Sequence, residues 1–392
     1  MIDVERARRD TPACEHVLHL NNAGSSLPPQ PVLDAVVGHL QLEAEIGGYE
    51  AHERNEQATE RVYGAASELL GCREDELAFS SSATRAWDMA FYGFRFQPGD
   101  RILTAVAEYA SNFIAYLQVA ARTGVEIVAV ENDEHGQVSV EALRALVDER
   151  VKLIAITHVP TNGGLVNPAA EIGKVARQAG IPYLLDVCQS AGQLPLDVGE
   201  LGCDALSLTG RKYLRGPRGT GLLYVRSELL ERLDPPLLDM HAADWVEPGR
   251  YRLRDDAKRF EEWEQSYAAK IGLGVAIDYA LGWGIDAIWA RVHELGERLR
   301  GRLAELAGIT VRDLGGTRCG IVTFDAAGVS ARELKAALAR DGINVSVSPT
   351  ESTLLDSRER GLPELIRASV HYYNTEDELD RFVDRVRIAA KC

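Results

Sequence analysis

Lys212 and Asp186 are charged residues placed beside strongly apolar stretches of the chain. Lys212 lies in TGRKYLRGPRGTG (209–221), just before the apolar run 222–225. This glycine-rich loop lacks the spacing of a Walker A loop, and no Ser or Thr follows the lysine. A lysine in an environment that favours its neutral amine can form a Schiff base with a carbonyl compound. Asp186 ends the apolar run 181–187, where a carboxylate is costly unless it pairs with a cation.

The commonest use of such a lysine is to hold pyridoxal 5′-phosphate (PLP). PLP needs a carboxylate for its ring nitrogen, donors for its phosphate and a ring that stacks on it. The stretch FSSSATRAW (79–87) places small hydroxyl residues before a helical run, as an anion site at a helix N-terminus requires. Taken alone, hydroxyl residues before a helix are more often simple helix caps, and Asp186 could also cap a helix. Their coincidence with Lys212 favours a PLP site.

Elements that can position these groups alternate between helical and strand patterns from about residue 75 to 225. Helices are predicted at 83–94, 112–123, 140–148 and 169–178, and strands at 101–106, 125–130, 152–159 and 181–187. This alternation predicts an α/β fold with a mostly parallel sheet covered by helices on both faces. Such sheets bind ligands beyond the carboxyl ends of their strands, so residues 108–112, 158–162, 186–189 and Lys212 are expected to meet there.

The pattern changes after residue 265. Helices are predicted at 268–281, 285–306 and 376–390, with strands at 320–325, 343–347 and 366–373. We therefore predict an N-terminal segment (1–50) that packs on a small domain and the active site, a large cofactor-binding domain (51–264) and a small α/β domain (265–392).

Composition excludes several classes of function. A net charge of −16 argues against nucleic acid or an anionic membrane as the main partner. No apolar run reaches the roughly 20 residues that span a bilayer, and the N-terminus has no secretory signal. The six cysteines form no CxxC pair, so we expect free thiols, no metal site and a cytoplasmic protein.

The order of these motifs resembles the class V aminotransferase family of fold-type I PLP-dependent enzymes. This family includes cysteine desulfurases, selenocysteine lyases and isopenicillin epimerases. The similarity runs from LNNAGSSLPP (20–29) to IRASVHYYNTEDELDRFV (366–383), and DVCQSAGQLPLDV (186–198) is its most specific part together with the Lys212 segment. The family is typically homodimeric with the active site at the interface, so the resemblance implies a homodimer.

The resemblance also implies a role for each matching residue. Lys212 would form the Schiff base and Asp186 would pair with the pyridinium nitrogen. Arg367 would hold the substrate carboxylate, for which a guanidinium is well shaped. The other cofactor contacts would be Gln189 near the phenolic oxygen, Thr161 or Asn162 at the position of an asparagine common in relatives, Tyr109 on the ring in place of a histidine, and Ala83, Thr84, Thr209 and Arg211 at the phosphate.

Two departures from the family pattern bear on the reaction. The interval SVSPTESTLLDSRERGLPEL (346–365), where desulfurases carry their persulfide-forming cysteine, contains none, and Cys319 and Cys392 lie elsewhere. A Gly-Thr pair that relatives place after RFE, where it reaches the partner's phosphate, is absent from RFEEWEQS (259–266). The missing cysteine leads us to expect an enzyme that is not a persulfide-forming cysteine desulfurase.

The segment EAEIGGYEAHE (43–53) resembles the substrate-facing segment of ergothioneine-pathway C–S lyases, and Gly47-Gly48 is also a plausible helix end. With Tyr49 and Asn22 as further substrate contacts, we predict a PLP-dependent β-lyase of S-substituted L-cysteines. Lys212 would remove the α-proton of the bound substrate, and elimination would give pyruvate and ammonia. The alternatives are an aminotransferase or epimerase, or a degenerate PLP fold that serves as a binding protein.

Overall fold

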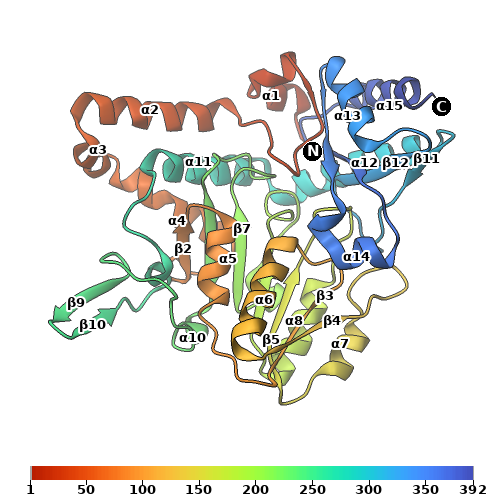
Figure 1. Ribbon diagram of the computed structural model, residues 1–392. Helices are drawn as coiled ribbons and strands as arrows, with labels where there is room; N and C mark the ends of the chain where they lie inside the picture. Colours follow the sequence, from red (N-terminus) through yellow and green to blue (C-terminus); the bar gives the residue numbers. More distant parts are fainter. Residues whose placement is uncertain (1, 392) are drawn as a thin grey trace.

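The central feature of the computed structural model, which describes residues 2–391, is a seven-stranded sheet (Figure 1). Its order is β2-β8-β7-β6-β5-β3-β4, and β8 runs antiparallel to both neighbours while the other pairs are parallel. The protein therefore has an α/β fold with a mostly parallel sheet. The strands are β2 (Leu77–Ser80), β3 (Arg101–Ala105), β4 (Glu126–Val130), β5 (Val151–Thr157), β6 (Tyr183–Asp186), β7 (Ala205–Thr209) and β8 (Gly221–Val225).

Helices cover both faces of this sheet, because alternate strand residues point to opposite sides. Leu153 and Ala155 of β5 belong to one hydrophobic cluster with α5 (Ala83–Phe91) and α6 (Ala110–Thr123). Ile154 and Ile156 belong to a second cluster with α8 (Ala169–Ala179). The carboxyl ends of β3, β5, β6 and β7 thus share one edge of the sheet, as the sequence pattern predicts.

A second, four-stranded antiparallel sheet lies in the C-terminal part of the chain, in the order β11-β12-β15-β14. The predicted strand 343–347 is in fact two short strands, of which β13 pairs instead with β1 of the N-terminal segment. The elements are β1 (Leu18–His19), α12 (Ile285–Ala304), β11 (Ile309–Val311), β12 (Ile321–Ala326), α13 (Ala331–Arg340), β13 (Ile343–Asn344), β14 (Ser346–Ser348), β15 (Leu365–Ser369) and α15 (Glu376–Ala390).

Helix α11 (Tyr267–Trp283) packs against α2 (Gln30–Ile46) and α4 (Glu56–Leu70), although it follows the large sheet in sequence. A hairpin of β9 (Ala243–Glu247) and β10 (Arg250–Leu253) extends away from the sheet (Figure 1).

The domain boundaries at residues 50 and 264 stay a prediction. The remaining elements are α1 (Val4–Arg9), η1 (Pro12–Glu15), α3 (Gly48–Arg54), η2 (Glu74–Glu76), α7 (Val140–Leu146), α9 (Val198–Leu201), α10 (Ser227–Leu230), η3 (Ala257–Phe260), η4 (Thr350–Thr353) and α14 (Leu354–Glu359).

Residues 2–391 contain no single helix that could span a membrane and no cluster of side chains that could hold a metal ion. No single helix there is both long and apolar enough to cross a membrane; α11 and α12 meet the combined requirement of length and composition only when taken together, across a bend of 79°. No group of three or more His, Cys, Asp or Glu side chains in the same range is arranged to hold a metal ion.

Candidate active site

A pocket with about 530 Å³ of empty space, partly open to solvent, lies at the carboxyl ends of the large-sheet strands. Lys212, Asp186 and the N-terminus of α5 meet there although they lie far apart in sequence. Nine of the site residues predicted from the sequence line this pocket: Ala83, Thr84, Tyr109, Thr161, Asp186, Gln189, Thr209, Arg211 and Lys212. Four further residues line the pocket, namely Ser82, Thr157, Val159 and Cys188; of these only Thr157 lies outside the stretches that the sequence pattern places at the site.

Lys212 is held by a loop that packs closely on a glycine turn. Gly192 has a φ of 89°, and a Cβ at this position would lie 2.5 Å from the carbonyl carbon of Tyr213. A larger residue would therefore push the lysine loop out of place. Burial of the Lys212 amine lowers its pKa to about 8, while nearby Asp186 acts in the opposite direction. A substantial share of the amine is therefore neutral near pH 8, as Schiff-base chemistry requires.

Asp186 is held in place by two hydrogen bonds at the end of β6. The backbone N–H of Cys188 donates to its Oδ1 at 2.8 Å, and Asn112 Nδ2 donates to its Oδ2 at 3.0 Å. The same Asn112 amide nitrogen also donates to Glu108 Oε1 at 3.0 Å. A second buried carboxyl group thus stands directly behind Asp186, at a strand-end position that the sequence pattern marks without assigning it a role.

Glu108 accepts hydrogen bonds from five donor groups. Besides Asn112, Thr104 Oγ1 (3.0 Å) and the backbone N–H groups of Tyr109 (2.8 Å) and Thr157 (3.1 Å) donate to it, as does the Thr157 hydroxyl. Burial raises the pKa of Glu108 to about 7; the donors from Thr157 and Asn112 lower it, and Asp186 raises it further. The two carboxyl groups therefore concentrate negative potential at the end of the pocket where a pyridinium nitrogen would lie.

The opposite end of the pocket is suited to a phosphate. Ser82 caps α5 and accepts from the Arg85 backbone N–H, which leaves the first turn of the helix facing the pocket. Gly221 begins β8 beneath this turn, and a Cβ there would lie 2.7 Å from the backbone nitrogen of Ala83. Free N–H groups at a helix N-terminus favour an anion. Arg211 also lines the pocket, but its guanidinium donates to Gly24 O of the N-terminal segment.

Arg367 lies beside the pocket, on β15. Its Nη1 donates to the carbonyl oxygen of Thr161 at 3.0 Å and to the Thr161 hydroxyl at 2.7 Å. Its Nε has no hydrogen-bond partner among residues 2–391. Burial lowers the pKa of Arg367 to about 10, so it keeps its charge at neutral pH. A buried guanidinium with an unused donor is suited to a carboxylate ligand.

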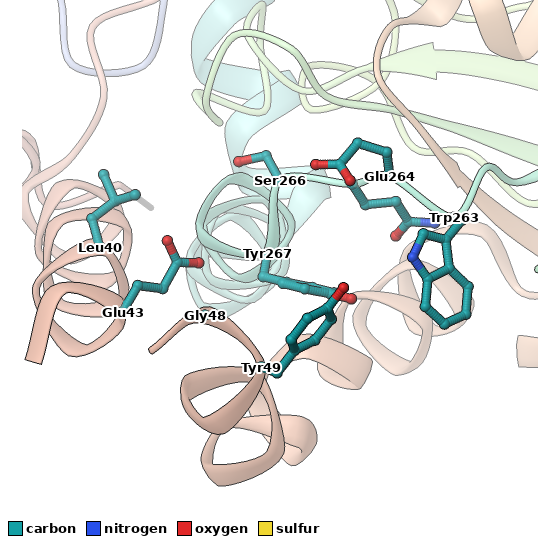
Figure 2. A pocket seen from close by; sticks show the side chains of 9 residues that line it. Leu40, Glu43, Gly48, Tyr49, Trp263, Glu264, Ser266 and Tyr267 are labelled. Atoms are coloured by element: carbon teal, nitrogen blue, oxygen red, sulfur yellow. The ribbon is translucent and has the colours of Figure 1, made fainter. Parts of the chain in front are cut away.

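The structure separates three other predicted residues from the pocket. Asn162 donates to Pro349 O and Thr353 Oγ1, both at 3.1 Å, so Thr161 and not Asn162 faces the pocket. Asn22 is buried and donates to Ser369 O at 2.7 Å. Tyr49 is 69% exposed and lines a separate hollow, which has about 920 Å³ of empty space, together with Trp263 and Tyr267 (Figure 2).

One of the six cysteines, Cys188, lines the pocket. The interval that lacks cysteine folds as β14, η4 and α14, and Asn162 ties its start to the large domain. Cys188 lies in the pocket beside Asp186, and burial raises the pKa of its thiol well above the ordinary value. Cys319 is buried, and Cys392 lies outside the described residues.

The residues that surround the pocket fit PLP. Gln189 Oε1 is a buried acceptor without a hydrogen-bond partner among residues 2–391, and Lys212 lines the same pocket. A buried amide oxygen left unpaired is costly without a ligand. PLP would engage Lys212 through its aldehyde, Asp186 through its ring nitrogen and the α5 N-terminus through its phosphate.

Comparisons with known proteins agree with this fit. The sequence model of the family described as Aminotransferase class-V matches residues 18–382. A protein of Xylella fastidiosa named "Probable cysteine desulfurase" is 31% identical over 97% of this chain and 94% of its own length. The apo cysteine desulfurase of Thermococcus onnurineus NA1 superimposes with a TM-score of 0.92 at 25% identity, covering 100% of this chain and 99% of the other. A C-DES mutant with glycine covalently linked to PLP has a TM-score of 0.87 at 23% identity, covering 97% of this chain and 98% of its own.

The fold and pocket define a fold-type I enzyme that depends on PLP. The chain belongs to the aminotransferase class V family.

The reaction predicted from the sequence is wrong. Curated relatives that cover nearly the whole chain are named cysteine desulfurases, the class that the prediction of a β-lyase for S-substituted cysteines excluded. They equally give no support to the aminotransferase or epimerase alternative. The exclusion rested on one missing thiol in 346–365, whereas the groups that can act on the substrate carbons lie in the pocket and do not depend on that thiol.

Proposed function

We propose that this protein is a cysteine desulfurase, which cleaves the C–S bond of L-cysteine to give L-alanine. The observation that carries the proposal is the meeting of Lys212, Asp186 and Arg367 around one pocket, in a chain similar over its whole length to cysteine desulfurases. The relatives supply the substrate class, and the pocket supplies the groups that the chemistry needs.

Each of these residues has a distinct task in this proposal. Arg367 binds the substrate carboxylate through its unused Nε and so orients the Cα–H bond toward Lys212. Lys212 Nζ, with its pKa lowered to about 8, takes the Cα proton and returns it later in the reaction. Asp186 holds the positive charge of the ring nitrogen. When bound, PLP supplies an electron-withdrawing ring that stabilises negative charge on the substrate carbons.

The sulfur needs an acceptor thiol, so the balanced reaction is L-cysteine plus a thiol giving L-alanine plus a persulfide. Among the described cysteines only Cys188 lines the pocket, and its raised pKa makes it a poor nucleophile. The interval 346–365 offers no thiol. We therefore assign the acceptor role to a thiol from outside this chain, either a small molecule or a second protein.

Alanine formation tests this function. The PLP-loaded protein is incubated with L-cysteine and dithiothreitol, and alanine, sulfide and pyruvate are measured. Alanine and sulfide in equal amounts are expected, and Cys188→Ser should still form both because the acceptor is external. A protein that forms pyruvate without alanine, or neither product, would contradict the proposal. Loss of alanine in Cys188→Ser with retained PLP would contradict the external acceptor alone.

The proposal includes a homodimer in which a second copy supplies Tyr49. Helix α2 exposes Leu33, Val37 and Leu40, and Tyr49 and Trp263 are exposed beside the hollow shown in Figure 2. These apolar side chains support burial against a partner chain. Tyr49 lies outside the pocket of its own chain, so its predicted contact with substrate requires a neighbouring copy. The cytoplasmic location likewise remains a proposal.

A further inference from the structure

Arg215, three residues after Lys212, has an unusual backbone conformation. Its φ is 63°, and within residues 2–391 the other non-glycine residue with positive φ is Lys391, at the end of α15. Arginine is strained in this left-handed region, which glycine adopts freely. The backbone N–H of Arg215 donates to the carbonyl oxygen of Lys212 at 2.9 Å. The strained residue therefore closes the turn that begins at the cofactor lysine.

Arg215 is only 1% exposed, and neutral oxygens accept hydrogen bonds from all three nitrogens of its guanidinium. Nε donates to Leu27 O at 2.8 Å, Nη1 to the Tyr372 hydroxyl at 2.7 Å and Nη2 to Thr11 Oγ1 at 2.5 Å. The guanidinium carbon also lies 4.6 Å from the centre of the Tyr373 ring. No ion pair joins Arg215 to a carboxylate within the described chain.

Neither the backbone nor the burial favours arginine at this position. A buried charge without a counter-ion is unfavourable, and glycine would remove the backbone strain. What arginine adds is a rigid fork of donors that reaches three oxygens at once. These oxygens belong to the N-terminal segment (Thr11 and Leu27) and to the connection between β15 and α15 (Tyr372).

Both connected segments contribute to the site. In the N-terminal segment, Ala23 O accepts from Gln189 Nε2 at 3.1 Å, and Gly24 O accepts from Arg211. The same segment also contacts β15, because the Ala23 N–H donates to Ser369 Oγ at 2.9 Å. Ser369 follows Arg367 by two residues on this strand. Arg215 thus sits where the lysine loop, the N-terminal segment and the strand of the carboxylate-binding arginine converge.

We propose that Arg215 is a positioning residue, which fixes the Lys212 loop to the N-terminal segment and to the β15–α15 connection so that the amine stays in line with the cofactor. It touches neither substrate nor cofactor. The inference rests on Lys212 as the cofactor lysine and does not depend on which amino acid the enzyme consumes.

The test measures covalent attachment of the cofactor without any substrate. Each PLP-loaded protein is reduced with borohydride, and the cofactor fixed to Lys212 is compared with the bound cofactor that stays unattached. Glycine adopts the left-handed backbone conformation freely, so Arg215→Gly removes the guanidinium and its hydrogen bonds without adding backbone strain. We expect the ratio of attached to unattached cofactor to fall about tenfold or more, because an amine that is no longer held in line loses the advantage of a fixed geometry for attack on the aldehyde.

Matched variants separate positioning from stability. Tyr372→Phe removes one oxygen partner of Arg215, whereas Tyr63→Phe removes a buried hydroxyl that bonds Glu261 at 2.5 Å. The attached-to-unattached ratio should fall about threefold in Tyr372→Phe, the size expected for one lost hydrogen bond, and stay unchanged in Tyr63→Phe.

A wild-type ratio in Arg215→Gly, even with a lowered melting temperature, would overturn the proposal and leave Arg215 a purely structural residue. If Arg215→Gly does not fold, the comparison of the two tyrosine variants decides, and equal ratios in them would overturn it. This experiment does not measure alanine formation. A result that overturns the role of Arg215 can therefore be distinguished from a result that overturns the proposed function.

Discussion

At the scale of single residues, the site depends on how burial shifts proton affinities. Burial lowers the pKa of Lys212 to about 8 and raises that of Glu108 to about 7, so both groups titrate near neutral pH. The first shift supplies a neutral amine to the pocket. The second places a titrating carboxyl group behind Asp186, to which Asn112 connects it.

Glu108 gives a prediction for the stability of the cofactor-free protein. Its pKa is raised above 4.5, so the folded chain retains a proton that the unfolded chain has released. Stability from this group is therefore lost as pH rises from about 4.5 to about 7. Glu108→Gln should show a smaller fall in melting temperature between about pH 5 and about pH 8 than the wild type. An equal or larger fall would show that Glu108 does not titrate in this range.

At the scale of elements, tight contacts between turns place the Lys212 loop. Gly192→Ala would put a Cβ against the Tyr213 backbone at a φ of 89°. We expect a loss of about 2–4 kcal/mol in unfolding free energy, from backbone strain and overpacking together. Gly180→Ala is the matched control, because its φ is 66° with nothing within 4 Å. It should lose only about 1 kcal/mol in a denaturant titration; equal losses would show that the contact with Tyr213 is unimportant.

Sequence patterns predicted the alternating elements well because each strand and helix has a local period. They placed α5, α6 and the strand-end residues, and so brought Lys212 and Asp186 together. They did not separate β13 from β14, since the two strands are nearly contiguous and only long-range pairing assigns them to different sheets. The choice between Thr161 and Asn162 also depended on a distant partner, the start of the 349–353 turn. Nothing in the sequence indicates the left-handed backbone of Arg215.

At the scale of the whole molecule, the proposed dimer accounts for apolar side chains that the single chain leaves exposed. In sedimentation, the 42.9 kDa chain should have twice its own mass. Val37→Glu on α2 should weaken the dimer, while Ile388→Glu, at an exposed position of α15, should not. A monomeric wild type, or equal effects of the two substitutions, would contradict a dimer formed through α2.

The missing loop thiol shows how a whole-chain comparison corrects a local inference. Residues 346–365 differ from the desulfurase pattern, yet relatives named cysteine desulfurases match almost the entire chain. The residues of one loop can change which thiol accepts the sulfur. The pocket residues determine which bonds of the substrate are activated. We therefore propose that the chain keeps this class of reaction and differs from its relatives in its sulfur acceptor.

The claim that Lys212 carries the cofactor underlies every functional statement, and peptide mapping tests it most directly. The PLP-loaded protein is reduced with borohydride, digested and analysed by mass spectrometry. We predict that the mass of the reduced cofactor is found on the peptide that contains Lys212, and that Lys212→Ala shows none. Attachment at another lysine, or bound PLP without attachment in the wild type, would contradict the account.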